Sequence, residues 1–221
     1  MKRVILIGYM GAGKTTVGKA LAQELGITFY DLDWYISSRM RKTIAQIFEE
    51  RGEDGFRQIE RNMLHEVAEF EDVVISCGGG TPCFFDNIDY MNQQAPVVYL
   101  KAEPEVLYKH LAMSKNDRPL LRGKSQEELI TFIREQLDKR EPFYTKAAYS
   151  LDVSLMDDYT KIKNSVAQVR KLLNILINGP LKTPRNSTTL TVGELPTSAS
   201  TKKGMSTSHH VRIIRRSTCV K

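Results

Sequence analysis

Long apolar runs are missing from this chain of 221 residues. No stretch approaches the roughly 20 consecutive apolar residues that a membrane-spanning helix needs, so we expect no membrane partner. The first apolar segment already begins at Val4, which leaves no room for a signal peptide before it. We therefore expect a cytoplasmic protein.

Cysteine is also scarce. Cys77, Cys83 and Cys219 have neither the spacing of metal ligands nor that of a disulfide framework. Such usage fits a reducing compartment. Cys77 lies in an apolar segment, so we expect it to be a small core residue rather than a nucleophile.

Acidic residues are nearly absent from the end of the chain. Residues 178–221 contain eight Lys or Arg and one acid, whereas residues 1–177 contain 24 basic and 25 acidic residues. The net charge of +6 therefore belongs to the tail, and the nearly neutral domain gives little reason to expect nucleic-acid binding. The tail is basic, rich in Ser and Thr, and without periodicity, so we expect a disordered extension. Its segment 211–216 could touch an acidic partner or a membrane, although a solvated tail is the simpler interpretation.

Residues 1–177 alternate short apolar segments with amphipathic ones. The continuous apolar segments predict strands that are buried on both faces, and their alternation with helices is typical of a parallel sheet. We therefore predict an α/β, three-layer fold with a five-stranded parallel sheet flanked by helices, with ligands at the carboxyl ends of the strands. The expected strands cover residues 3–8, 28–31, 73–76, 97–100 and 150–153. The expected helices cover residues 14–25, 33–40, 43–51, 55–70, 103–113, 125–140 and 158–177.

The segment from Gly8 to Thr15 reads Gly-Tyr-Met-Gly-Ala-Gly-Lys-Thr and stands between the first strand and the first helix. This is the Gly-x-x-x-x-Gly-Lys-Thr pattern of a P-loop. Its backbone N–H groups and the positive end of the helix are suited to the phosphates of a nucleoside triphosphate. Lys14 is expected to reach the β- and γ-phosphates, and the Thr15 hydroxyl to coordinate Mg²⁺.

Two carboxylates follow the second strand, in Asp31-Leu32-Asp33. Alternation along a strand would put Asp31 and Asp33 on one side, near the phosphates. One could lie close to Mg²⁺, and the other could orient an acceptor hydroxyl or take its proton; Asp33 could also simply cap the next helix. The third strand ends in Ser76 rather than an acid, which favours Asp31 as the carboxylate near the metal.

Other polar features complete the candidate site. The turn Gly78-Gly79-Gly80 allows a ligand to approach the backbone closely, as the floor of an acceptor site would require. Arg57, Arg118 and Arg140 carry the planar fork that binds carboxylate or phosphate, but their spacing alone does not show that they converge. Arg118 lies in residues 114–124, a polar and basic segment typical of a mobile lid.

In this order, the motifs resemble those of the shikimate kinases, P-loop kinases of small molecules with a nucleoside monophosphate kinase-like fold. The shared set is Gly8–Thr15, Asp31-Leu32-Asp33, Gly55-Phe56-Arg57 with Glu60, Gly78-Gly79-Gly80, Arg118-Pro119-Leu120-Leu121, and Arg140 with Tyr144. The P-loop is generic, but the rest of the series is far more specific. The resemblance implies one kinase domain over residues 1–177, with its lid at about 114–124.

The resemblance implies ATP-dependent phosphorylation of the 3-hydroxyl of shikimate, on the route to chorismate and the aromatic amino acids. It assigns shikimate binding to Asp33, Arg57, Gly79, Gly80 and Arg140. It assigns ATP binding to Gly11, Ala12, Gly13, Lys14, Thr15, Thr16 and Arg118. It places Mg²⁺ on Thr15 and, through water, near Asp31, and it makes Asp33, Lys14 and Arg118 the catalytic residues. Phe48 and Phe56 could wall the apolar side of the ring.

Alternatives stay open on the residues alone. Another small-molecule P-loop kinase, such as a gluconate or nucleotide kinase, could use two arginines and an aspartate for its own acceptor. A nucleotide-binding regulatory module that had lost catalysis would be expected to lack Lys14, Asp33 or Arg118, and all three are present. We expect a monomer whose partners are shikimate and ATP.

Overall fold

A computed structural model describes residues 2–113, 125–153, 163–171, 190–191 and 212–213. The expected lid at 114–124, with Arg118, lies outside the described residues, as does most of the tail. Of the helix expected at 158–177, residues 163–171 are described and are helical.

A parallel sheet of five strands forms the centre of the molecule, in the order β2-β3-β1-β4-β5. The strands are β1 (Arg3–Ile7), β2 (Thr28–Asp31), β3 (Val73–Ser76), β4 (Val97–Lys101) and β5 (Tyr149–Asp152). The three central strands are almost wholly buried, as their continuous apolar sequences require. The predicted strand segments and the parallel α/β sheet are therefore confirmed.

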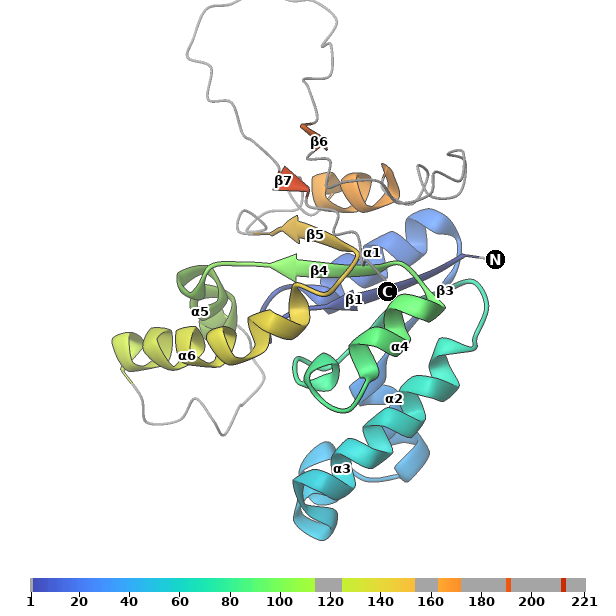
Figure 1. Cartoon of the computed structure of the whole chain (residues 1–221), viewed down its shortest axis with the longest axis vertical. Helices are drawn as coiled ribbons and strands as arrows, with labels where there is room; N and C mark the ends of the chain where they lie inside the picture. Colours follow the sequence, from blue (N-terminus) through green and yellow to red (C-terminus); the bar gives the residue numbers. More distant parts are fainter. Residues whose placement is uncertain (1, 114–124, 154–162, 172–189, 192–211, 214–221) are drawn as a thin grey trace, which may run out of the picture.

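Helices surround the sheet. Those whose bounds lie wholly within the described residues are α1 (Lys14–Leu25), α2 (Leu32–Met40), α3 (Ile44–Ala68), α4 (Asn87–Gln94), α5 (Pro104–Met113) and α6 (Gln126–Tyr144). The β1-to-β2 and β3-to-β4 connections run in opposite directions across the sheet. Right-handed crossovers therefore place α1 and α4 on opposite faces, which gives the three layers of Figure 1. Residues 163–171 join the α1 layer, where Arg170 pairs with Glu24.

The carboxyl ends of β1, β2 and β3 lie side by side at one edge of the sheet. In the sheet register, Ser76 at the end of β3 lies opposite both Leu6 of β1 and Asp31 of β2. The next residue, Cys77, donates its backbone N–H to the Leu6 carbonyl at 3.0 Å. The P-loop, the glycine turn and the start of α2 consequently begin side by side at the same edge of the sheet.

Several helix boundaries differ from the prediction. The two helices expected at 43–51 and 55–70 form a single segment, α3, interrupted only at Gly52, whose φ of 67° and ψ of −177° are not helical. A short 3₁₀ turn, η1 (Thr81–Cys83), and α4 were not predicted. Helix α6 continues one turn beyond the expected end, through Pro142.

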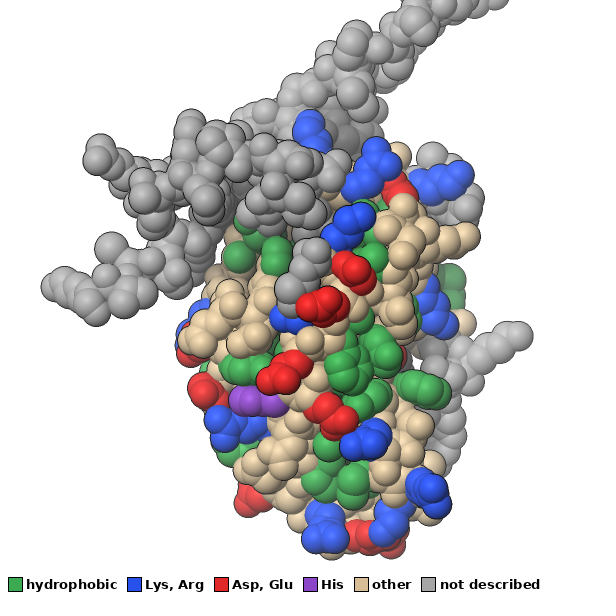
Figure 2. Space-filling view, turned by 90° about the vertical axis from the view of Figure 1, so that its right-hand side faces the viewer, with side chains coloured by type: hydrophobic (Ala, Val, Ile, Leu, Met, Phe, Trp, Pro, Cys, Tyr) green, Lys and Arg blue, Asp and Glu red, His purple; other side chains and the backbone are tan. Residues whose placement is uncertain are grey.

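The tail contains two short strands that were not expected, β6 (Leu190–Thr191) and β7 (Arg212–Ile213), which pair antiparallel. On the face shown in Figure 2, acidic and basic side chains are interspersed. This mixture agrees with the nearly balanced charge of residues 1–177.

None of the helices in the described ranges has the length and apolar character needed to cross a membrane.

We predict that Gly8→Ala lowers the free energy of unfolding by about 2–4 kcal/mol. A Cβ at this position would lie 2.6 Å from the carbonyl oxygen of Leu100 in β4, and Gly8 has a φ of 145°. Gly26→Ala is the matched control, because Gly26 also has a positive φ, 67°, but has open space around the added Cβ. It should cost only about 1–2 kcal/mol. Urea denaturation measures both, and equal losses would contradict the proposed clash.

Candidate active site

The P-loop is supported from behind by α5. His110 in the last turn of α5 donates its Nδ1 proton to the Gly11 carbonyl at 2.8 Å. A Cβ on Gly11 would lie within 3.2 Å of Leu107 and Leu111 in the same helix. At the end of the loop, Gly13 adopts a left-handed conformation and caps α1, which begins at Lys14. The loop is therefore held at the positive end of α1, where an anion is favoured.

The Lys14 side chain folds back across the loop. Its Nζ donates to the carbonyl oxygens of Gly8, at 2.8 Å, and Tyr9, at 3.0 Å. The ammonium group and the end of α1 thus place two sources of positive potential at the mouth of the loop.

Thr15 and Asp31 meet at this mouth. The Thr15 hydroxyl donates to Asp31 Oδ2 at 3.1 Å, while Asp31 Oδ1 accepts the Trp34 backbone N–H at 3.3 Å and caps α2. A hydroxyl and a carboxylate are oxygen ligands of the kind that Mg²⁺ prefers, usually completed by phosphate and water. No group of three or more His, Cys, Asp or Glu suited to a metal occurs in the described part of the chain. The Thr15 hydroxyl and the Asp31 carboxylate fit such an ion as two of its oxygen ligands.

The strand geometry predicted for Asp33 is wrong. β2 ends at Asp31 and α2 begins at Leu32, so Asp33 lies in the first turn of a helix rather than two residues along a strand. It is also Asp31, not Asp33, that caps α2. The Asp33 carboxylate nevertheless reaches the glycine turn, where Oδ1 lies 2.9 Å from the position of a Cβ on Gly78.

The environment of Asp33 raises the proton affinity of its carboxylate. The partial burial of its carboxyl group, followed by the nearby carboxylates of Asp31 and Glu60, raises the pKa of Asp33 to about 6, although Lys14 and Arg57 oppose the shift. The residue remains open to solvent on one side. Asp33 is thus a carboxylate with raised proton affinity, set between the P-loop and the glycine turn.

Two of the three arginines converge on the glycine turn. A Cβ on Gly80 would lie 2.9 Å from Nη2 of Arg57, and one on Gly79 would lie 3.4 Å from Nη1 of Arg140. Arg57 comes from α3 and Arg140 from α6, 83 residues later in the chain. The absence of side chains at Gly79 and Gly80 lets both guanidinium groups come close to the backbone.

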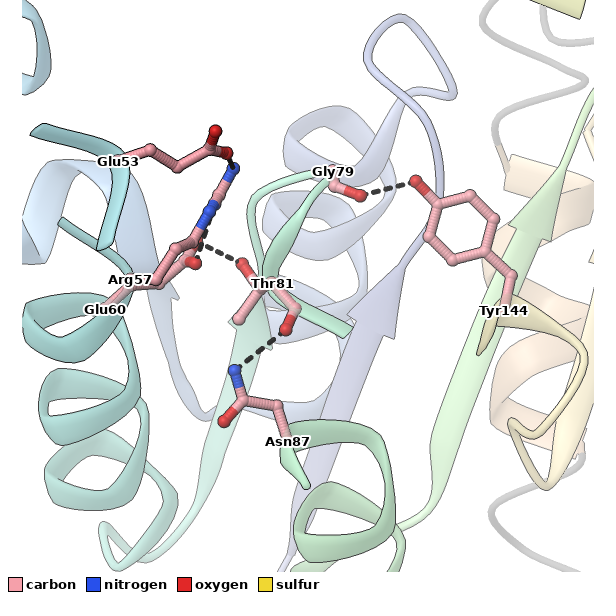
Figure 3. A network of polar contacts seen from close by, with 7 residues as sticks. All are labelled: Glu53, Arg57, Glu60, Gly79, Thr81, Asn87 and Tyr144. Carbon is pink, nitrogen blue, oxygen red and sulfur yellow. Dashed lines mark hydrogen bonds and ion pairs between the residues drawn. The ribbon is translucent and has the colours of Figure 1, made fainter. Parts of the chain in front are cut away.

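A buried carboxylate fixes Arg57. Glu60, with a side chain only 1% exposed, accepts from Arg57 Nη1 at 2.8 Å and from the Thr81 hydroxyl at 2.6 Å. The Thr81 carbonyl in turn accepts from Asn87 Nδ2 at 2.8 Å. On the exposed side, Arg57 Nη2 bonds Glu53 at 3.2 Å. Figure 3 shows this chain of contacts running from α3 through Thr81, the residue after the glycine turn, to Asn87 at the start of α4.

Aromatic rings surround the same guanidinium. Its Cζ lies 4.0 Å from the centroid of Phe84, a residue that no sequence motif singled out, and 5.1 Å from that of Phe56. Phe48 and Phe56 stack with centroids 4.3 Å apart. The two rings that were expected to wall an acceptor therefore also pack against Arg57.

The structure brings together the P-loop, Asp31, Asp33, the glycine turn and two arginines; Arg118 lies outside the described residues. Sequence reasoning gave no role to Glu60, although its spacing of three residues from Arg57 on a helix was a usable signal. It also gave no role to Tyr144, whose hydroxyl donates to the Gly79 carbonyl at 2.5 Å.

Cys77 is buried, as predicted, and burial raises the pKa of its thiol above the usual range.

A parallel sheet of this order, with a P-loop after its central strand and two arginines on a glycine turn at the same edge, is the arrangement of a P-loop kinase. The model of the shikimate kinase family matches residues 10–173. The chain therefore belongs to the shikimate kinase family.

Individual relatives agree. The shikimate kinase of Phocaeicola vulgatus is 58% identical over 174 residues, which cover 79% of this chain and 99% of that protein. The crystal structure of shikimate kinase from Bacteroides thetaiotaomicron is 53% identical, with a TM-score of 0.76 over 78% of this chain and 98% of that one. A structure of the Acinetobacter baumannii shikimate kinase in complex with shikimate is 33% identical, with a TM-score of 0.67 over 82% and 96% of the two chains.

We predict that Glu60→Ala lowers the free energy of unfolding by about 3–5 kcal/mol, because it leaves the half-buried Arg57 charge without its buried partner. Glu53→Ala is the matched control: it removes the other carboxylate on Arg57, but one whose side chain is 60% exposed. Its loss should cost less than about 1 kcal/mol. Chemical denaturation measures both variants, and a similar loss in the two would argue against a special role for the buried partner.

Proposed function

We propose that this chain transfers the γ-phosphoryl group of ATP to the 3-hydroxyl of shikimate, giving shikimate 3-phosphate and ADP. The observation that carries the proposal is the convergence of Arg57 and Arg140 on a glycine turn beside the P-loop. Such a site offers two guanidinium groups to an acidic acceptor next to a phosphate-binding loop. Membership of the shikimate kinase family identifies the acceptor.

The acceptor would lie on the glycine turn. Arg57 and Arg140 would bind its carboxylate, and the backbone of Gly79 and Gly80 would allow the ring to approach closely. Asp33, at the adjacent Gly78, would accept a hydrogen bond from the reacting hydroxyl. The buried Glu60 supports this assignment, because it holds the Arg57 side chain in place before any ligand binds.

The nucleotide would be held by the P-loop from Gly11 to Thr16, with Lys14 on the β- and γ-phosphates and Arg118 as a further phosphate ligand. Thr15 would hold Mg²⁺ directly and Asp31 through water. When bound, the ion would neutralise charge on the phosphates. The catalytic residues in this assignment are Asp33, Lys14 and Arg118.

In the chemical step, the acceptor oxygen would form a bond to the γ-phosphorus while the bond from that phosphorus to the β-γ bridging oxygen breaks, and ADP leaves with the electron pair. The hydroxyl proton would pass to the Asp33 carboxylate, whose raised proton affinity suits that task. Most of the rate would come from positioning and charge neutralisation by the surrounding groups.

We further propose a monomeric, cytoplasmic enzyme without nucleic-acid or membrane partners, formed by residues 1–177 with residues 114–124 as its lid and 178–221 as a basic extension outside the kinase domain. The mixed surface charge supports this proposal. Gluconate is the alternative acceptor, since the two arginines would also bind its carboxylate, but the family assignment favours shikimate.

An assay of ADP release with ATP, Mg²⁺ and either shikimate or gluconate tests the function. We expect ADP release that depends on shikimate and does not respond to gluconate. Release that requires gluconate, or no release that depends on shikimate, would overturn the proposal.

We predict that Arg57→Lys raises the KM for shikimate at least about tenfold, because lysine keeps the charge beside Glu60 but loses the bidentate fork. Arg61→Lys is the matched control; Arg61 lies one turn further along α3 and pairs with Asp86 instead. Steady-state kinetics at saturating ATP measure both. An unchanged KM in Arg57→Lys would remove Arg57 from the acceptor site.

A further inference from the structure

The last turn of α6 is attached to the rest of the site at two points, both within the four residues that follow Arg140. Glu141 accepts from the Tyr99 hydroxyl at 2.7 Å and from Lys101 Nζ at 3.0 Å, which fastens this turn to β4. Tyr144 lies one turn after Arg140 and donates to the Gly79 carbonyl at 2.5 Å. Arg140 is therefore carried by a helical turn that is fixed both to the sheet and to the glycine turn.

The Tyr144 hydroxyl is well suited to hold this bond. The side chain is fully buried, and burial raises the pKa of Tyr144 above its usual range, so the hydroxyl remains a proton donor at all physiological pH values. The ring packs against Tyr99 with centroids 5.0 Å apart. Close packing on a strand residue leaves the hydroxyl little freedom to choose another acceptor.

The bond determines the orientation of the peptide between Gly79 and Gly80. In a trans peptide the carbonyl oxygen and the following N–H point in opposite directions, and the described residues contain no cis peptide. Because the Gly79 carbonyl faces Tyr144, the Gly80 N–H faces the side on which Arg57 lies. Figure 3 shows Tyr144 and Arg57 on opposite sides of the glycine turn.

The bond from Tyr144 is needed because the glycine residues alone would not maintain this orientation of the peptide. Gly-Gly peptides have few steric restrictions and can rotate at little cost. Within the described part of the chain, Thr81 N–H and Cys83 N–H close the η1 turn onto Gly78 and Gly80, and Tyr144 supplies the contact from the opposite side. A rotated Gly79–Gly80 peptide would present a carbonyl, instead of an N–H, beside the Arg57 guanidinium.

We propose that Tyr144 is a positioning residue for the acceptor: its hydroxyl holds the Gly79–Gly80 peptide so that the Gly80 N–H faces the bound acceptor, and it keeps the Arg140 turn against the same glycines. The part that concerns the acceptor rests on the proposed function. The nucleotide side should be unaffected, because the P-loop is held by α5 and by its own backbone.

The test is Tyr144→Phe, which removes the hydroxyl and keeps the ring. We expect the KM for shikimate to rise about 5–10-fold, the effect of losing one hydrogen bond in a binding site. The KM for ATP should change less than about twofold. Tyr35→Phe is the matched control, because its hydroxyl also makes a bond, at 2.8 Å to Glu66, but between α2 and α3 away from the glycine turn.

A second measurement separates this proposal from the proposed function. In protein labelled with ¹⁵N-glycine, Tyr144→Phe should shift the Gly80 amide resonance, and Tyr35→Phe should not. If the wild-type protein phosphorylates shikimate but Tyr144→Phe keeps its KM, or changes both KM values equally, the positioning role is wrong while the function stands. If the wild type shows no turnover with shikimate, the function is wrong, and the Gly80 resonance alone then decides: an unchanged signal overturns the positioning role and a shift supports it.

Discussion

The acceptor side of the site depends on one buried carboxylate. Glu60 is removed from water, and an ionised group in that position is tolerated only when its lone pairs are taken by charged or polar donors. Arg57 and Thr81 supply those donors. Because the first comes from α3 and the second from η1, directly after the glycine turn, the requirement to satisfy Glu60 fixes the position of one element relative to the other. Arg57 is thereby held against Gly80 without any ligand.

The opposite side of the glycine turn is held by a neutral contact. Tyr144 bonds the Gly79 carbonyl, so the turn lies between an ionic support on α3 and a phenol on α6. Both supports meet at the carboxyl edge of a parallel sheet, where the P-loop also begins. Two helices that are far apart in the sequence thus bring Arg57 and Arg140 to one short backbone segment.

The sheet could be predicted from the sequence because its strands are buried on both faces and read as continuous apolar runs. The P-loop could also be predicted from the sequence, because its pattern is local. The helix α4 was missed because Asn87–Gln94 is mostly polar, and only Ile88 and Met91 mark its buried face. The predicted placement of Asp33 was wrong for a local reason. The prediction extended the side-chain alternation of β2 to Asp33, but Asp31 caps α2, so the strand ends two residues earlier.

The contacts that create the acceptor site could not be predicted in this way, because they join residues that are far apart in the sequence. Those of Thr81 with Glu60 and of Tyr144 with Gly79 join residues 21 and 65 positions apart, and no periodicity encodes such pairs. The ordered series of short motifs can still identify the family, because residues of one motif contact residues of a later motif in the folded protein. The phosphate-binding half of the site is therefore local and generic, whereas the half that distinguishes the acceptor exists only once the chain has folded.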